Sequence, residues 1–196
     1  SPSEAPKMRS VIQAAGGRGE FESVVLGTSA YEAVQSGEAD FTEPFMAWEG
    51  IEAELAGRPF TTFDYRDFGI PDAYNVIIIG NAPWLADPPD LARAFVQAAQ
   101  RGYQLAADDA AAGAQALIDA NPDLASAAEL VRRSQEVLSA GYLKDDDGVV
   151  GTQTLERWAG YSGWVFDQGV LTGPDGAPLA TRPDFATWFT DEYLAP

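Results

Sequence analysis

Two aromatic side chains and two carboxylates lie within seven residues of this sequence, in the run EPFMAWE at residues 43–49. A carboxylate accepts hydrogen bonds from amino groups, and an aromatic ring offers a flat surface on which a planar molecule stacks. The combination therefore suits a small, flat ligand that donates hydrogen bonds. The alternative interpretation is a strand end with a core phenylalanine and a half-buried tryptophan, because aromatic residues belong to cores more often than to sites.

The place of this run in the predicted architecture favours binding. Ser36-Gly37-Glu38 marks the end of a helix that turns into a short strand closing at Phe41, and a further helix is expected over residues 44–56. Open α/β sheets bind ligands where the carboxyl end of a strand meets the next helix. Residues 42–49 are expected at that edge.

Short strands and helices alternate through the first part of the chain. A helix that begins with a serine cap and an early proline is expected to run to residue 15. Strands are predicted at 23–26 and 60–65, and a helix at 30–35. This alternation is typical of a parallel sheet with crossover helices. No strand precedes the first helix, so we interpret the chain as the later part of a larger protein, or a fragment of it.

The pattern changes after Gly69-Ile70-Pro71. An apolar run at 74–79 predicts a buried strand, and apolar spacing predicts helices afterwards. The sequence therefore indicates an α/β part at residues 1–70 and a helix-rich part at 71–196. The helices are expected at 89–106, 107–120, 124–138, 152–169 and 185–193.

Composition excludes several classes of function. The 196 residues include 12 Lys and Arg against 30 Asp and Glu, and the net charge of −18 argues against nucleic acid or an anionic membrane as partner. No apolar run approaches the roughly 20 residues that span a bilayer. The chain has no Cys and no His, which removes thiol catalysis, thiolate metal sites and the commonest acid–base group.

One acidic loop resembles part of a calcium site. With Asp145 as the first position, Glu156 falls at the twelfth, where a bidentate ligand belongs. The sixth position, which needs glycine, is Val150, and the fifth is Val149. We therefore predict a solvated acidic turn and no metal site.

An ordered set of short motifs resembles the substrate-binding proteins of ABC importers for the thiamine pyrimidine precursor; riboflavin-binding members look similar. The set covers nearly all of this chain but only the later part of a family member. Its members are QSGEAD (35–40), EPF (43–45), WEGIEA (48–53), FGIP (68–71) with Tyr74, VIIIGN (76–81), Trp84-Leu85, PDL (89–91), Phe95 and Gly102-Tyr103.

The resemblance implies a type II periplasmic-binding-protein-like fold, with two α/β lobes joined by hinge strands around a ligand cleft. Residues 1–70 would form most of the second lobe without its first strand. Residues 68–74 would be the hinge return, and 71–196 would pack largely on the first lobe. The resemblance also implies an extracytoplasmic binding protein, periplasmic or a cell-surface lipoprotein. It would deliver its ligand to an ABC permease and have no cofactor and no enzymatic activity.

The candidate site follows from the shared edge of a parallel sheet, where successive strand–helix loops meet. Hydroxyls and helix starts supply donors, Glu43 an acceptor, and Phe45 or Trp48 a stacking surface; Glu49 is interpreted as solvated. Two tyrosines flank the expected hinge. The candidate ligand-binding residues are Glu43, Phe45, Trp48, Ser1, Ser3, Thr28, Ser29, Thr42, Tyr65 and Tyr74.

Other functions stay open at this point. A related pyrimidine-synthesising branch uses a His and a Cys-rich loop, but the matching residues 70–74 read IPDAY here. A glycosidase pair such as Glu43 and Glu49, or a purely structural domain, are further alternatives. The uncovered apolar edge at 74–79 predicts either a missing segment supplied in trans or a dimer formed by exchange of elements.

Overall fold

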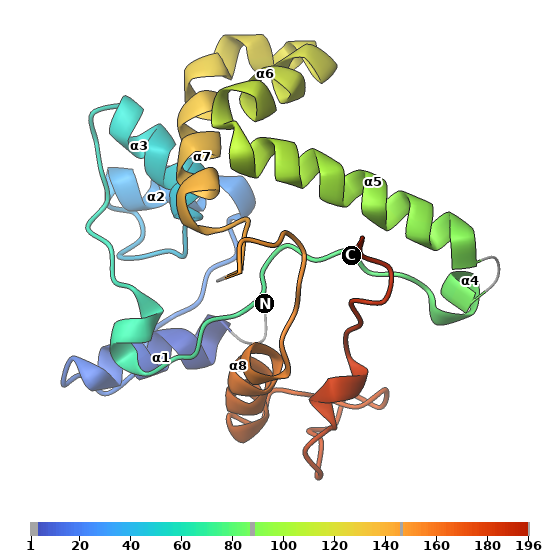
Figure 1. Cartoon of the computed structure of the whole chain (residues 1–196). Helices are drawn as coiled ribbons and strands as arrows, with labels where there is room; N and C mark the ends of the chain where they lie inside the picture. The colour runs from blue at the N-terminus through green and yellow to red at the C-terminus, as the bar shows by residue number, and fades with distance from the viewer. Residues whose placement is uncertain (1–3, 87–88, 146, 196) are drawn as a thin grey trace. The chain divides into compact units, whose positions relative to one another are not determined.

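The computed structural model describes residues 4–86, 89–145 and 147–195, and these divide into two compact units (Figure 1). The first unit runs to Ser23 and includes Thr62–Pro83 and Gln153–Glu192. The second unit contains Val24–Thr61, Trp84–Thr152 and the chain from Tyr193 onwards. The predicted division of a two-lobe fold at residue 70 stays a prediction.

The first unit is held together by aromatic side chains. Its elements are α1 (Glu4–Ala14), η3 (Tyr65–Phe68), α8 (Leu155–Asp167) and η5 (Phe185–Thr187). The Trp158 ring on α8 stacks on Phe189 with ring centres 6.1 Å apart, and Phe185 meets Trp188 edge-on at 4.9 Å. Thr154 caps α8, because its hydroxyl oxygen accepts from the Arg157 amide. The helix predicted at 185–193 is reduced to the short η5, and three of its residues, Phe185, Trp188 and Phe189, belong to this aromatic cluster.

The second unit is a helical layer around α7 (Ala128–Gly141). Figure 1 shows α5 (Pro89–Asp108), α6 (Ala110–Ala120) and α7 packed side by side. Val131 on α7, Ala92 on α5 and Ala114 on α6 are each 1% exposed and belong to the core of this unit. The remaining elements are η1 (Gly27–Ser29), α2 (Ala30–Ser36), η2 (Met46–Gly50), α3 (Ile51–Leu55), α4 (Ala82–Ala86) and η4 (Pro122–Ala127).

Local contacts fix how α5, α6 and α7 approach one another. Asp109 begins α6 by accepting a hydrogen bond from the Ala112 amide at 2.9 Å. A Cβ at Gly113 would lie 2.8 Å from Ala106, so glycine permits the close approach of α6 to α5. Ser139 on α7 donates its hydroxyl to the Ala106 carbonyl at 2.6 Å, which ties α7 to the end of α5.

The parallel sheet predicted for the first part of the chain is not formed in the described residues. Residues 23–26, 60–64 and 74–79 are irregular, and the described chain shows only two isolated antiparallel bridges, at Lys144–Val150 and Thr172–Pro178. A strand exists only when a neighbour completes its backbone hydrogen bonds. Val76 and Ile79 are each 84% exposed, so no other described part of the chain covers the segment that was expected to form a buried strand.

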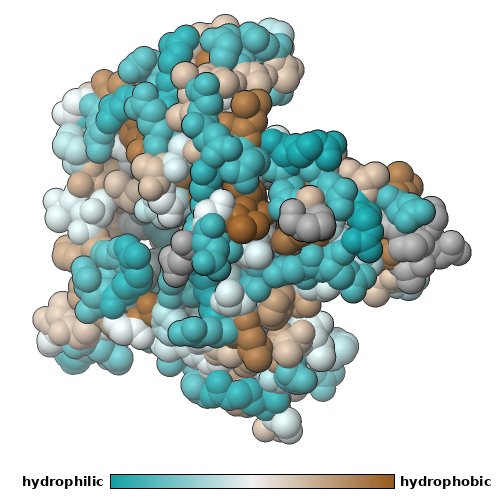
Figure 2. All heavy atoms as spheres, in the orientation of Figure 1, coloured by the Kyte–Doolittle hydropathy of each residue, from teal (hydrophilic) through white to brown (hydrophobic). Residues whose placement is uncertain are grey.

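These exposed apolar segments are expected to drive association. On the face drawn in Figure 2, hydrophobic residues reach the surface between hydrophilic ones. Because unpaired apolar segments recruit further chains, replacing Val76 and Ile79 together by lysine should shift the sedimentation of the chain toward the monomer. The charge-matched control is the same double change at the exposed Thr61 and Thr62. A wild-type chain that is already a stable monomer at micromolar concentration would contradict this expectation.

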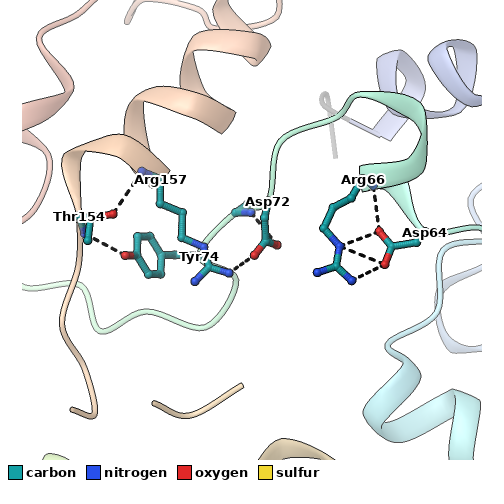
Figure 3. A network of polar contacts seen from close by, with 7 residues as sticks. Asp64, Arg66, Asp72, Tyr74, Thr154 and Arg157 are labelled. Atoms are coloured by element: carbon teal, nitrogen blue, oxygen red, sulfur yellow. Dashed lines mark hydrogen bonds and ion pairs between the residues drawn. The ribbon is translucent and has the colours of Figure 1, made fainter. Parts of the chain in front are cut away.

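Asp64 makes a local ion pair with a predictable response to acid. Its carboxylate caps η3 by accepting from the Arg66 amide at 2.9 Å, and it also accepts from the Arg66 guanidinium (Figure 3). These hydrogen bonds to Arg66 lower the pKa of Asp64 from 3.8 to about 2. The stabilisation is therefore present above the unfolded pKa and is lost as the pH falls toward 2.

We expect Asp64→Asn to remove this acid-dependent component. Both side chains are largely exposed, so the difference in unfolding free energy at neutral pH should be only about 0.2–1 kcal/mol. Urea unfolding at pH values between 2 and 6 measures it. The exposed Asp147→Asn is the control, and identical pH profiles for Asp64→Asn and wild type would contradict the assignment.

Candidate functional site

The predicted site run begins a π-helical turn. Phe45 precedes η2 in an extended conformation, and its carbonyl accepts from the Gly50 amide at 3.2 Å and from the Trp48 amide at 2.9 Å. The predicted helix at 44–56 is thus a π turn over Met46–Gly50 followed by α3. Single π turns are rare and occur frequently at functional sites.

A buried glycine makes this turn possible. A Cβ at Gly50 would lie 2.6 Å from the Met46 methyl carbon, so the Met46 side chain lies directly over the glycine. Ile51 and Ala53 follow as buried residues of α3, and η2 and α3 both pack against α7. The turn is therefore anchored in the core of the second unit and holds residues 43–49 on a fixed base.

Two carboxylates and a phenol gather at the turn. The Phe45 amide donates to Glu49 Oε2 at 3.0 Å. The phenol of Tyr31 on α2 lies close enough to feel the charges of both carboxylates. Partial burial raises the pKa of Tyr31, and the charges of Glu49 and Glu43 raise it further. Glu43 Oε2 is itself shielded from solvent. We call Tyr31, Glu43 and Glu49 the acceptor cluster.

The aromatic residues of the run differ in exposure. The Phe45 side chain is 56% exposed, which leaves its ring accessible, whereas Trp48 is half-buried. Thr42 is half-buried and Ser29 is exposed, and both belong to the same unit as Glu43. Thr42, Glu43, Phe45 and Trp48 thus form one contiguous run in the second unit, and their role in binding stays a prediction.

The other predicted residues are placed elsewhere. Ser1 and Ser3 lie outside the described residues, and so does the side chain of Thr28. Tyr65 and Tyr74 belong to the first unit, whereas Glu43 belongs to the second.

The polar group of Tyr74 holds the start of α8. Its hydroxyl oxygen accepts a hydrogen bond from the Thr154 amide at 2.8 Å (Figure 3). The Arg157 guanidinium lies 4.7 Å from the Tyr74 ring centre and is ion-paired with Asp72. Through these contacts Tyr74 stabilises the amino end of α8. Tyr65 is half-buried, with Lys7 Nζ of α1 lying 4.9 Å from its ring centre.

Sequence reasoning missed Tyr31 and interpreted Glu49 as solvated. The structure corrects the second point, because Glu49 is half-buried and accepts a hydrogen bond from the Phe45 amide. One local signal was available: Glu49 follows Phe45 by four residues, the spacing at which a side chain reaches back to the start of a helical turn. No local pattern links Tyr31 to Glu49.

The acidic loop at Asp145 is a closed turn. Its carboxylate accepts from the Asp147 amide at 3.0 Å, the Val149 amide at 2.7 Å and the Thr152 hydroxyl. These hydrogen bonds, with that of Thr152 the strongest influence, lower the pKa of Asp145. Among the described residues, no group of three acidic side chains is arranged to hold a metal ion. The same part of the chain contains no helix that is long and apolar enough to span a bilayer.

Comparisons with known proteins give the family. The family model described as NMT1/THI5 like matches residues 1–112. A formylaminopyrimidine-binding protein of Halalkalibacterium halodurans is 24% identical over 170 residues, which cover 84% of this chain and 51% of that protein. The chain therefore spans about half the length of this relative.

These findings confirm the resemblance drawn from the ordered motifs, all of which lie within the matched residues. They also support the coarse fold prediction, because the family has a periplasmic-binding-protein-like fold. The chain belongs to the NMT1/THI5-like family, which includes binding proteins for thiamine pyrimidine precursors.

Proposed function

We propose that this chain forms part of an ABC importer's substrate-binding protein, which captures a small, flat, amino-bearing heterocycle outside the cytoplasm. A thiamine pyrimidine precursor, hydroxymethylpyrimidine or formylaminopyrimidine, is the proposed ligand. The observation that carries the proposal is the acceptor cluster beside the accessible Phe45 ring. It lies within the residues that match the family.

The chemistry of the cluster matches an aminopyrimidine. Ring amino groups donate hydrogen bonds, and Glu43 accepts them; such a charge-assisted bond contributes roughly 1.5–3 kcal/mol. The pyrimidine plane stacks on Phe45 or Trp48, which adds about 0.5–1.5 kcal/mol. Ser29 and Thr42, with Thr28, Ser1 and Ser3, complete the proposed site from the loops before the helices. Tyr65 and Tyr74 remain proposed contacts of the hinge.

The charge around the cluster restricts the ligand further. Residues 19–57 contain nine acidic side chains and no Lys or Arg. Such a segment disfavours an anionic ligand and suits a neutral or positively charged one. This is why we place the unphosphorylated pyrimidine ahead of its phosphate ester.

The transport role rests on the family. The matched relative is a binding protein by name, and a binding protein for an importer works outside the cytoplasm with a permease as partner. The second lobe would contain residues 1–70. The hinge return and the helices that follow it would comprise residues 71–196. A segment supplied in trans or a second copy would then cover the exposed apolar run. A pyrimidine-synthase-like enzyme is disfavoured because the sequence has no His and no Cys.

Ligand-dependent thermal stabilisation tests the proposal. The purified chain is titrated with hydroxymethylpyrimidine, formylaminopyrimidine, riboflavin and a sugar, and calorimetry measures the affinities. A ligand at 100 times its dissociation constant should stabilise the fold by about 2.7 kcal/mol. We expect this for the aminopyrimidines. Stabilisation by riboflavin alone, by the sugar alone or by no compound would contradict the proposal.

A further inference from the structure

A short irregular segment at residues 193–195 lies against one face of α5 in the second unit (Figure 1). The chain passes from the first unit into the second directly before Tyr193. Tyr193 and Leu194 are half-buried, and Ala195 is exposed. We call residues 193–195 the strap.

The two half-buried side chains of the strap each have a defined place. The Arg93 guanidinium on α5 lies 5.6 Å from the Tyr193 ring centre, and the Tyr193 hydroxyl donates to the Leu85 carbonyl at 3.4 Å. Leu194 passes closely over Gly151, where an added Cβ would lie 3.1 Å from Leu194 Cδ2. The second unit thus contacts the strap through a phenol, a ring face and an aliphatic side chain.

Gln100 contacts the backbone of the strap. Its side-chain oxygen accepts from the Ala195 amide at 2.8 Å, and its side-chain nitrogen donates to the Val150 carbonyl at 3.1 Å. Because Val150 holds the nitrogen, Gln100 presents only its oxygen to the strap, and that oxygen only accepts. The segment bound here must therefore offer a backbone N–H at this place, which proline lacks. We call Leu85, Arg93, Gln100 and Gly151 the strap site.

We propose that the strap site is a peptide-binding site whose second occupant is the strap of another copy of this chain. Releasing three residues leaves α5, α6 and α7 packed on one another, so it requires far less free energy than unfolding the unit. A strap from a second copy brings the same phenol, aliphatic side chain and N–H to the same partners. Exchange of an identical element in this way joins two copies at low cost.

A fluorescent peptide of residues 191–195 tests the site. The receptor is the chain with Tyr193→Ser and Leu194→Ser, which removes the two half-buried side chains of its own strap. Fluorescence anisotropy should show saturable binding, about tenfold or more tighter than to the wild type, where the tethered strap competes at high effective concentration. The same peptide with Ala195→Pro should bind about tenfold more weakly. No binding, or equal binding of the two peptides, would overturn the assignment.

The role of Gln100 has a matched control on the same helix. Gln100→Leu in the receptor should weaken the peptide about tenfold. Gln104→Leu carries the same chemical change at a residue that bonds to Asp108 of α5, and it should leave binding unchanged. Equal effects of the two substitutions would contradict the specific contact.

Two complementary variants test the second copy as partner. Gln100→Leu keeps the strap but damages the site, whereas Tyr193→Ser with Leu194→Ser keeps the site but damages the strap. An equimolar mixture should sediment with more dimer than either variant alone, at high salt because two copies of net charge −18 repel. Without additional dimer in the mixture, the second copy is not the occupant, even if the peptide binds.

A measurement on the wild-type chain covers the case in which these variants do not fold. An isotope-labelled chain is mixed with an excess of the unlabelled peptide of residues 191–195. The peptide should displace the strap and raise the hydrogen-exchange rate of the Ala195 amide, which Gln100 otherwise protects. An unchanged exchange rate would overturn the proposal.

Discussion

Replacing Trp158 by alanine is expected to lower the unfolding free energy of the first unit by about 3–5 kcal/mol. The Trp158 ring contacts Phe189 at 6.1 Å and Trp188 at 6.2 Å between ring centres. Its indole N–H donates to Gln153 Oε1 at 2.8 Å, directly before the start of α8. Truncation removes stacking partners from several segments and leaves a void that the rigid α8 cannot fill.

Urea unfolding followed by circular dichroism measures this loss. Trp188→Ala is the matched control, because that indole is 41% exposed and its truncation removes less buried area. The loss of unfolding free energy should be well above that of Trp188→Ala when Trp158 is replaced by alanine. A loss below about 1 kcal/mol for Trp158→Ala would show that the aromatic cluster does not hold the unit together.

Glu43→Gln is expected to weaken aminopyrimidine binding by about 1.5–3 kcal/mol, or roughly ten- to hundredfold in dissociation constant. The substitution preserves shape and removes charge at a residue whose Oε2 is shielded from solvent. Folding should be nearly unaffected. Calorimetric titration and thermal melts of the same sample measure both quantities.

The control for Glu43→Gln is Glu52→Gln, an exposed position on α3 that carries the same chemical change. The variant Trp48→Ala distinguishes a binding residue from a core residue. If Trp48 contacts the ligand, the substitution lowers the affinity; if Trp48 is a core residue, it lowers the stability by about 3–5 kcal/mol. Equal affinity in Glu43→Gln and wild type would remove Glu43 from the site.

The helices were predictable because their signals are local. Apolar spacing predicted helices at 89–106 and 152–169, and the structure has α5 at Pro89–Asp108 and α8 at Leu155–Asp167. The boundary between α5 and α6 falls at Asp109, whose side chain caps the second helix. Capping and periodicity act within one turn, so the sequence specifies them without knowledge of distant partners.

The strands were not predictable in the same way. Residues 74–79 have the composition of a buried strand, yet a strand depends on a neighbour that local sequence does not name. In the described chain these residues stay irregular and largely exposed. The apolar pattern thus shows that the segment can form a buried strand, and not which neighbour, if any, pairs with it.

In the candidate site, too, the residues that are close in sequence were predictable, and those brought together by the fold were not. Glu43, Phe45 and Trp48 are close in sequence, so their neighbourhood followed from the run itself. Tyr31 lies on α2, eighteen positions before Glu49, and only the fold brings its phenol within reach of the charge of Glu49. The π turn was also not predictable from the sequence. It depends on the absence of a side chain at Gly50, because the Met46 side chain lies over that glycine.

The packing of Met46 over Gly50 makes the turn visible to spectroscopy. The chain has two methionines, Met8 and Met46, so methyl-labelled protein gives two methionine resonances. One belongs to the Met46 methyl carbon, which lies over Gly50 in the π turn. Its chemical shift therefore reports, without any substitution, whether the turn rearranges when a ligand is added.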